Sequence, residues 1–290
     1  MTTPLVNVNI TELAELSGKN AEQIETALLK LPQVDCPVIH RFSPGLNIRE
    51  LFMPKGTIAI GHHQNFEHFN VMLKGKVLML NDDGTKTELT APQSFTGKAG
   101  RKVGYVMEDV VWQNIYPTTE TNIDILENTY LTKSDTFKLN QTLKFGVDEI
   151  EREADRLDYQ KMLKDVGVSH ELALAQSENT EDVLELKLET LKVKLGKSPI
   201  QGTGLFATSY INEDEIISLA RIEGMRTQAG RYTNHSVSPN AKMIKDADDN
   251  VFLVAIRNIN GCMGGELGEE ITVDYRQVIE EMAKEVLCQQ

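Results

Sequence analysis

Cysteine is scarce in this chain: Cys36, Cys262 and Cys288 are the only three among 290 residues. They are widely separated and form neither a Cys-x-x-Cys pair nor the spacing of a zinc site, a pattern typical of free thiols in a reducing cytoplasm. Long apolar runs are also absent, since no stretch reaches the roughly 18 residues that a transmembrane helix needs. The first residues lack the basic start and apolar stretch of a signal peptide. These absences predict a cytoplasmic protein.

Basic residues are outnumbered, with 30 Lys and Arg against 43 Asp and Glu, and the net charge is −13. Nucleic-acid binders usually carry a basic excess or a basic stripe, so the composition argues against a nucleic-acid partner. An acidic surface does tolerate a basic protein substrate. The length of 290 residues is sufficient for two domains of ordinary size, each with its own core.

Periodicity and turn residues divide the chain into four segments, of which the first two precede residue 147. Residues 1–36 form a helical N-terminal segment with two short helical patterns, one at 10–16 and one at 21–30. Residues 37–146 contain about seven short runs rich in Val, Ile, Leu and aromatic residues. Turn signals such as Asn-Asp-Asp-Gly at 81–84 separate these runs, which predicts a sandwich or barrel.

The third and fourth segments are a linker and a second β domain. Residues 147–182 form a charged helical linker, with Ile150, Ala154, Leu157 and Met162 on one apolar stripe. Ser169 is the expected N-cap of a second helix in this linker. Residues 183–290 return to short strands. The predicted fold class is therefore mainly β with helical segments.

Four motifs follow one another in the last segment. They are Gly202-Thr-Gly-Leu-Phe-Ala207, Arg231-Tyr-Thr-Asn-His-Ser-Val-Ser-Pro-Asn-Ala241, Val251-Phe-Leu-Val-Ala-Ile-Arg-Asn-Ile259 and Gly268-Glu-Glu-Ile-Thr-Val-Asp-Tyr275. Taken singly, the first indicates a tight turn, Asn234-His-Ser a polar turn, and Tyr275 a half-buried core residue. Together, the order and the amino-acid sequences of these motifs resemble the SET family from Lys197 to Tyr275.

The SET resemblance implies a compact fold of small β-sheets and methylation of protein lysine side chains with S-adenosylmethionine. It implies no metal, and the partner is a lysine-containing protein substrate. The residues implied to bind the cofactor, partly through their backbone, are Gly202, Gly204, Leu205, Phe206, Asn234 and His235. The residues implied to line the lysine channel as catalytic groups are Tyr275 and Tyr232.

Three features depart from the family pattern. The insert that usually shapes the substrate groove is nearly absent between the first two motifs. The tyrosine of the second family motif is missing from Leu219-Ala-Arg-Ile-Glu-Gly224, and no zinc-binding cysteine cluster follows the domain. Shortened domains of this kind resemble those of bacterial and phage proteins. They leave open a second function, a catalytically inactive structural or assembly protein of a bacteriophage, located in the host cytoplasm or the virion.

The stretch from Gly56 to Gly75 resembles the first cupin motif, with His62 at the first ligand position. Gln64 and His68 stand where that motif has His and Glu, and the later part of the β segment offers no further histidine. The ligand positions of the cupin motif therefore do not supply a complete set of three metal ligands.

The cupin resemblance implies a cupin-like β-barrel at 37–146, of a kind common in phage genomes, and common cupin behaviour would allow a homo-oligomer. A barrel kept for its structure is the main expectation. The residues that form the weaker alternative, a metal site, are His62, Glu67 and His68.

Overall fold

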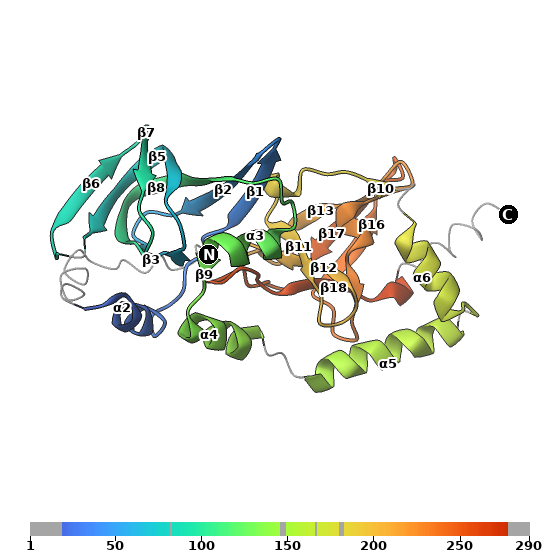
Figure 1. The fold of residues 1–290 in the computed structure, drawn as a ribbon. Helices are drawn as coiled ribbons and strands as arrows, with labels where there is room; N and C mark the ends of the chain where they lie inside the picture. The colour runs from blue at the N-terminus through green and yellow to red at the C-terminus, as the bar shows by residue number, and fades with distance from the viewer. Residues whose placement is uncertain (1–18, 82, 146–148, 166, 180–182, 278–290) are drawn as a thin grey trace. The chain divides into compact units, whose positions relative to one another are not determined.

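The computed structural model describes residues 19–81, 83–145, 149–165, 167–179 and 183–277 (Figure 1). The helical pattern expected at 10–16 and the position of Cys288 lie outside these residues. The chain divides into two compact units. The first comprises Met1–Phe145 with Met263–Glu266, and the second comprises Gly146–Cys262 with Leu267–Gln290. No helix in the described part of the chain is long and apolar enough to cross a membrane.

A seven-stranded antiparallel sheet makes up most of the first unit (Figure 1). Its order is β1-β2-β8-β5-β6, with β3 paired to β8 and β7 paired to β5. The strands are β1 (Val38–Ser43), β2 (Leu46–Met53), β3 (Ile58–Ile60), β5 (His68–Leu80), β6 (Lys86–Thr90), β7 (Gln93–Gly97) and β8 (Val103–Pro117). The predicted β segment is confirmed. The pairings of its described strands do not close into a ring, so the sheet is open rather than a complete barrel.

Strand β5 bends so that its two halves pair with different neighbours. Its first half pairs with β7 and its second half with β6, and the register against β8 shifts between them. Gly75 lies at this bend with φ 90°, and a Cβ there would collide with the carbonyl oxygen of Asp109. Only glycine fits that position. The bend lets Met72 and Val77 enter one buried cluster with Val106 of β8.

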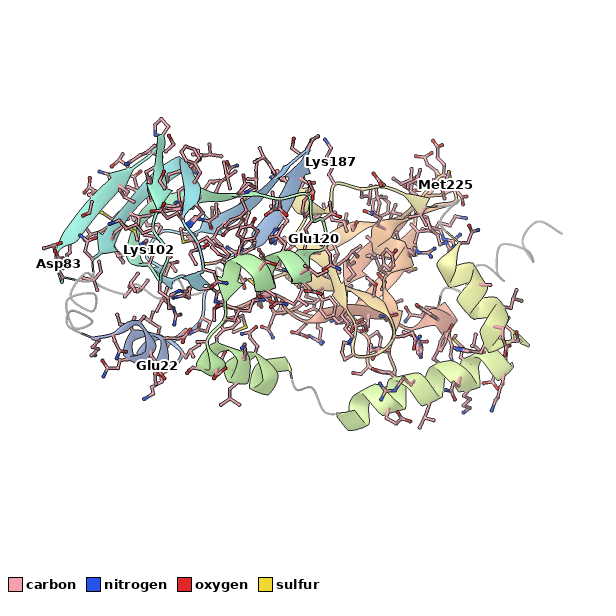
Figure 2. All side chains as sticks on the ribbon, in the orientation of Figure 1. Glu22, Asp83, Lys102, Glu120, Lys187 and Met225 are labelled. Carbon is pink, nitrogen blue, oxygen red and sulfur yellow. The ribbon has the colours of Figure 1, made fainter. Side chains whose placement is uncertain are left out.

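Three helices and a short ladder complete the described part of the first unit. They are α2 (Ala21–Leu28), α3 (Ile123–Tyr130), α4 (Asp135–Phe145), β4 (His63–Gln64) and β9 (Leu131–Thr132). Helix α2 begins at Asn20, whose side chain forms a capping box with Gln23. Glu22, labelled in Figure 2, adds a carboxylate to the first turn, where the helix dipole favours it. The buried Ile24 then packs against Val103.

The second unit contains two small sheets, as the SET resemblance implies. One has the order β10-β14-β13-β17-β16 and the other the order β11-β12-β18-β15. The first sheet consists of β10 (Val183–Leu184), β13 (Ile216–Ile222), β14 (Met225–Thr227), β16 (Ala241–Lys245) and β17 (Val251–Ala255). The second consists of β11 (Val193–Lys197), β12 (Thr203–Ala207), β15 (Asn234–His235) and β18 (Glu270–Val273). Buried residues of both sheets, Leu205, Leu253 and Ile271 among them, form one core.

The helices in the described part of the second unit are α5 (Glu149–Asp165), α6 (His170–Glu178), the short 3-10 turn Leu188–Thr190 and α7 (Gln228–Arg231). Ser169 caps α6 by accepting the N–H of Leu172 at 3.2 Å, as predicted. The apolar stripe predicted for α5 is partly wrong. Met162 is buried, but Leu157 is 56% exposed, whereas Asp155 is 2% exposed. Asp155 is buried because its Oδ1 accepts the backbone N–H of Val237 at 2.9 Å.

Candidate functional site

Asn234 connects the Asn-His motif to the turn that precedes β12. Its Nδ2 donates to the carbonyl oxygens of Gln201 at 3.2 Å and Thr203 at 3.4 Å, and to Oε1 of Glu270 at 2.8 Å. Gly202 lies between these two carbonyls with φ 53°, and no atom lies within 4 Å of the place its Cβ would occupy. The turn is therefore fixed by Asn234 on one side and open beside Gly202.

Gly204 makes room for a buried carboxylate. A Cβ at this position would collide with the carboxyl group of Glu270, which is 5% exposed. Leu205 and Phe206 are buried, and their backbones pair with β11 and β18. Of the first motif, the turn at Gly202 is thus the part whose backbone is accessible, and the roles expected of Leu205 and Phe206 stay predictions.

His235 lies beside Tyr275 because β15 runs parallel to β18, with His235 opposite Val273. The two rings are 5.4 Å apart between centroids, and the backbone N–H of Tyr275 donates to Nδ1 of His235 at 3.2 Å. Since Nδ1 accepts, the hydrogen of a neutral ring is assigned to Nε2. Asn234, His235 and Tyr275, predicted to act together, are brought together.

The phenol of Tyr275 is held by the residue that precedes Asn234. Its hydroxyl donates to the carbonyl oxygen of Thr233 at 2.8 Å. Burial raises the pKa of Tyr275 above its ordinary value of 10.0, and the nearby Tyr159 and Glu270 raise it further. The hydroxyl therefore stays protonated at physiological pH, so it can orient a ligand but cannot act as a base.

Helix α5 contributes residues to this site that the sequence did not single out. Asp158 accepts from Nε2 of His235 at 2.9 Å and from both terminal nitrogens of Arg276, at 2.6 and 3.0 Å. The hydrogen bonds from Arg276, followed by that from His235, lower the pKa of Asp158 to about 2 although its partial burial opposes this. Tyr159 packs edge-on against Tyr275 with centroids 5.9 Å apart. Their positions three and four residues after the buried Asp155, on the helical face that also carries Met162, are the one sequence signal for them.

Tyr232 stands apart from the cluster of Tyr159, His235 and Tyr275. It follows the last residue of α7, and the guanidinium of Arg231 lies 5.6 Å from the centre of its ring. The catalytic role expected of Tyr232 stays a prediction, and its observed contacts do not link it to Tyr275.

The three metal candidates of the first unit do not form a ligand group. His62 packs edge-on against Phe137, with ring centroids 4.6 Å apart, and burial lowers its pKa to about 4. Nδ1 of His68 lies 3.1 Å from the carbonyl oxygen of Phe66, and Glu67 is exposed. Within the described ranges, no cluster of three or more His, Cys, Asp or Glu is arranged to hold a metal ion.

Comparison with known families agrees with the geometry of the second unit. The family model described as SET domain matches residues 218–276, which include Asn234, His235 and Tyr275. Residues 218–276 are therefore similar to the SET domain. No curated protein matches the chain.

Several solved structures resemble part of the chain. A cupin domain from Bordetella pertussis is 16% identical and covers 31% of this chain and 99% of its own, with a TM-score of 0.26. A cupin superfamily protein from Desulfitobacterium hafniense is 13% identical. The match covers 31% of this chain and 84% of that protein, with a TM-score of 0.25. The EutQ protein of Clostridium difficile is 16% identical. The match covers 29% of this chain and 68% of that protein, with a TM-score of 0.24.

Proposed function

We propose that the second unit is a protein lysine methyltransferase that uses S-adenosylmethionine. The observation that supports this proposal most is that three consecutive residues, 233–235, contact the motif Gly268–Tyr275 or the turn at Gly202. Thr233 accepts the Tyr275 hydroxyl, Asn234 fixes the turn at Gly202, and the His235 ring accepts the Tyr275 backbone N–H. One short strand thus links the turn proposed to bind the cofactor with the phenol proposed to lie in the lysine channel.

The residues present fit such a cofactor. The side of Gly202 away from the protein is open, so its backbone can approach a ligand closely. The side chain of Asn234 uses its Nδ2 in every hydrogen bond found for it among the described residues, which leaves its Oδ1 to accept from a ligand. The Glu270 carboxylate beside it is suited to a cationic ligand. When bound, S-adenosylmethionine supplies a methyl group already activated by a positively charged sulfur.

The protein then has to position a neutral amine, because methyl transfer is an in-line displacement. A lysine side chain has an ordinary pKa near 10.4, so it must lose a proton before it can attack carbon. Tyr275 does not take that proton, since its own hydroxyl remains protonated. Desolvation beside the buried Tyr275 phenol favours the neutral amine, and the Tyr275 hydroxyl orients it.

Calorimetry with S-adenosylmethionine and with its demethylated product tests the proposal. We expect micromolar binding by the full chain, and a loss of about tenfold or more in the variant Asn234→Ala. Radiolabelled cofactor added to host lysate should then label a lysine-containing protein. Absence of binding by well-folded protein would overturn the proposal.

A second candidate is a catalytically inactive structural or assembly protein, such as a virion component or a homo-oligomer. Its specific support is that the stretch Leu219-Ala-Arg-Ile-Glu-Gly224 lacks the tyrosine of the second family motif, and that Nδ2 of Asn234 is already bonded within the protein. The same calorimetry separates the candidates. An inactive platform would bind neither form of the cofactor, and Asn234→Ala would change only its stability.

A further inference from the structure

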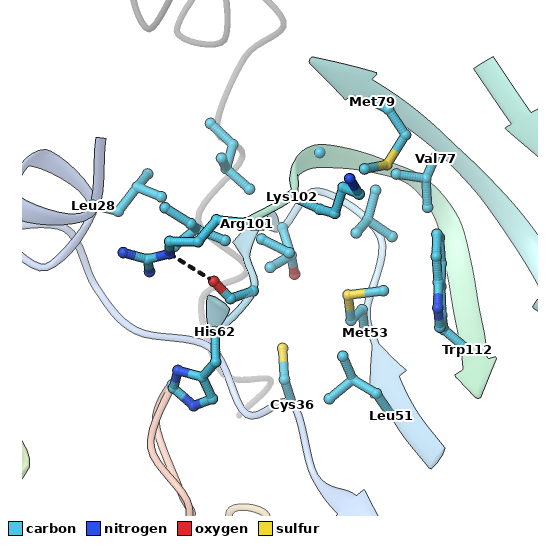
Figure 3. A pocket seen from close by; sticks show the side chains of 18 of the residues that line it. Leu28, Cys36, Leu51, Met53, His62, Val77, Met79, Arg101, Lys102 and Trp112 are labelled. Atoms are coloured by element: carbon cyan, nitrogen blue, oxygen red, sulfur yellow. Dashed lines mark hydrogen bonds between the residues drawn. The ribbon is translucent and has the colours of Figure 1, made fainter. Parts of the chain in front are cut away.

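The first unit contains a cavity of about 540 Å³ (Figure 3). It is bounded by α2, the segment 31–36, and strands β2, β3, β5 and β8. Protein interiors are close-packed and rarely leave voids larger than a water molecule. A volume of this size falls in the range of about 300–1,000 Å³ that small-molecule pockets occupy.

The walls of the cavity are largely apolar. The side chains that form them include Cys36, Leu51, Ala59, Met79, Leu89 and Trp112. All six pack against the buried cluster around Met72 and Val106, yet all six are only partly buried. Their exposed area faces the cavity, and an apolar ligand there would remove it from water. The two flexible thioethers, Met53 and Met79, can adapt to the shape of such a ligand.

The charged groups at the cavity are paired with one exception. Arg49 pairs with Glu127, Arg101 with Glu25, and Glu266 with Lys133. Lys102, labelled in Figure 2 and Figure 3, precedes β8 and lines the cavity. Its side chain is exposed and forms no ion pair within the described residues. Among the described residues that line the cavity, Lys102 is thus the one cation without an ion-pair partner.

The imidazole of His62 adds a polar group to the interior of the cavity. His62 lines the cavity, and neither of its ring nitrogens has a hydrogen-bond partner among the described residues. Burial is the largest cause of its lowered pKa, and the charges of Arg49, Lys133 and Arg101 lower it further against the opposing Glu127. A neutral His62 can donate or accept one hydrogen bond without bringing charge into the apolar space.

We propose that this cavity binds a small amphipathic carboxylate. The apolar body lies against Met53, Met79 and Trp112, and the carboxylate pairs with the ammonium group of Lys102. This function is separate from methyl transfer, because all the residues involved belong to the first unit.

Trp112 provides a direct readout, since it is the single tryptophan of the chain and lines the cavity. The probe is decanoate, titrated into the full chain below its micellar concentration, with decylammonium as a probe of equal chain length and opposite charge. We expect a saturable change in Trp112 emission with one equivalent of decanoate, and binding of decylammonium weaker by about tenfold or more. No saturable change, or equal affinity for the two probes, would overturn the proposal.

Two variants locate the site. Lys102→Glu should weaken decanoate binding by about tenfold or more, whereas Lys98→Glu, an exposed lysine outside the cavity, should change it by less than about twofold. Ala59→Phe should fill the cavity and abolish binding. Circular dichroism checks that each variant is folded, and if Ala59→Phe fails to fold, the lysine pair decides alone. Equal effects of the two lysine variants would place the carboxylate elsewhere and refute the assignment.

Discussion

Nε2 of His235 lies 2.9 Å from Oδ2 of Asp158, although the two residues are 77 positions apart in the chain. Asp158 is also held by two hydrogen bonds from Arg276, the residue that follows Tyr275. The carboxylate therefore joins helix α5, the Asn-His motif and the end of the final motif. It holds the imidazole in the tautomer whose Nδ1 accepts the Tyr275 N–H.

The variant Asp158→Asn tests this arrangement. It removes the negative charge that faces Arg276 and His235, so we expect the free energy of unfolding to fall by about 1–2 kcal/mol, the scale of hydrogen bonds to charged groups. Urea unfolding measures the change. Lys161→Gln, an exposed change on the same helix, is the control and should have an effect below about 0.5 kcal/mol. Identical stability of both variants would show that the Asp158 contacts contribute nothing.

The lowered pKa of the Asp158 carboxylate predicts that the stability of the protein depends on pH. This pKa is about 2 in the folded protein, against an ordinary value of 3.8. Because the folded value is lowered, the stabilisation is present above about pH 4 and is lost as the pH falls towards about 2. Partial exposure limits it to about 1–2 kcal/mol. The difference in unfolding free energy between wild type and Asp158→Asn should therefore shrink between about pH 5 and about pH 2.5; a constant difference would contradict the assignment.

Tyr275→Phe separates catalysis from cofactor binding. We expect an unchanged affinity for S-adenosylmethionine but methyl transfer slower by about two orders of magnitude or more, because in the proposed reaction the hydroxyl acts mainly at the transition state. The control is Tyr159→Phe, which keeps the ring that packs on Tyr275 and removes a different hydroxyl. Methylation rates and calorimetry of the three proteins give the answer. Equal activity of wild type and Tyr275→Phe would remove this residue from the reaction.

Gly204→Ala probes the close approach of β12 to Glu270. The added methyl group would collide with the Glu270 carboxyl, so we expect a loss of about 1–3 kcal/mol in unfolding free energy, typical of overpacking. If the collision is the cause, the loss should be smaller when Glu270→Ala is also present, and a double-mutant cycle in urea measures that coupling. Additive effects of the two changes would place the cause elsewhere.

Local signals predicted the parts of the fold that depend on neighbours in sequence. Ser169 is the N-cap that its position in the sequence predicts, and β5 and β6, which flank the predicted turn, do pair as a hairpin. The family resemblance added a long-range relationship, the proximity of His235 and Tyr275. The contribution of α5 was missed because hydrophobic periodicity selects apolar positions, whereas this helix buries Asp155 and turns Asp158 and Tyr159 towards the site.

In the first unit, a sequence spacing predicted a site that the structure does not form. Its motif from Gly56 to Gly75 contains histidines at approximately the spacing of a metal site, but spacing alone does not specify which way each ring points. His62 packs on Phe137, His68 turns towards the Phe66 carbonyl, and Glu67 is exposed. The cavity beside them could not be predicted either, because it depends on where the packing of core side chains is incomplete.

Helix α5 ends before the first residue of the SET match, at Asp165 against Ser218. A recombinant fragment trimmed to the matched boundaries would therefore lack Asp158, the acceptor of the His235 imidazole, and would expose the ring of Tyr275 that Tyr159 covers. Weak or absent activity in such a fragment would reflect the loss of this helix rather than an inert domain, so any excised version should begin upstream of Glu149.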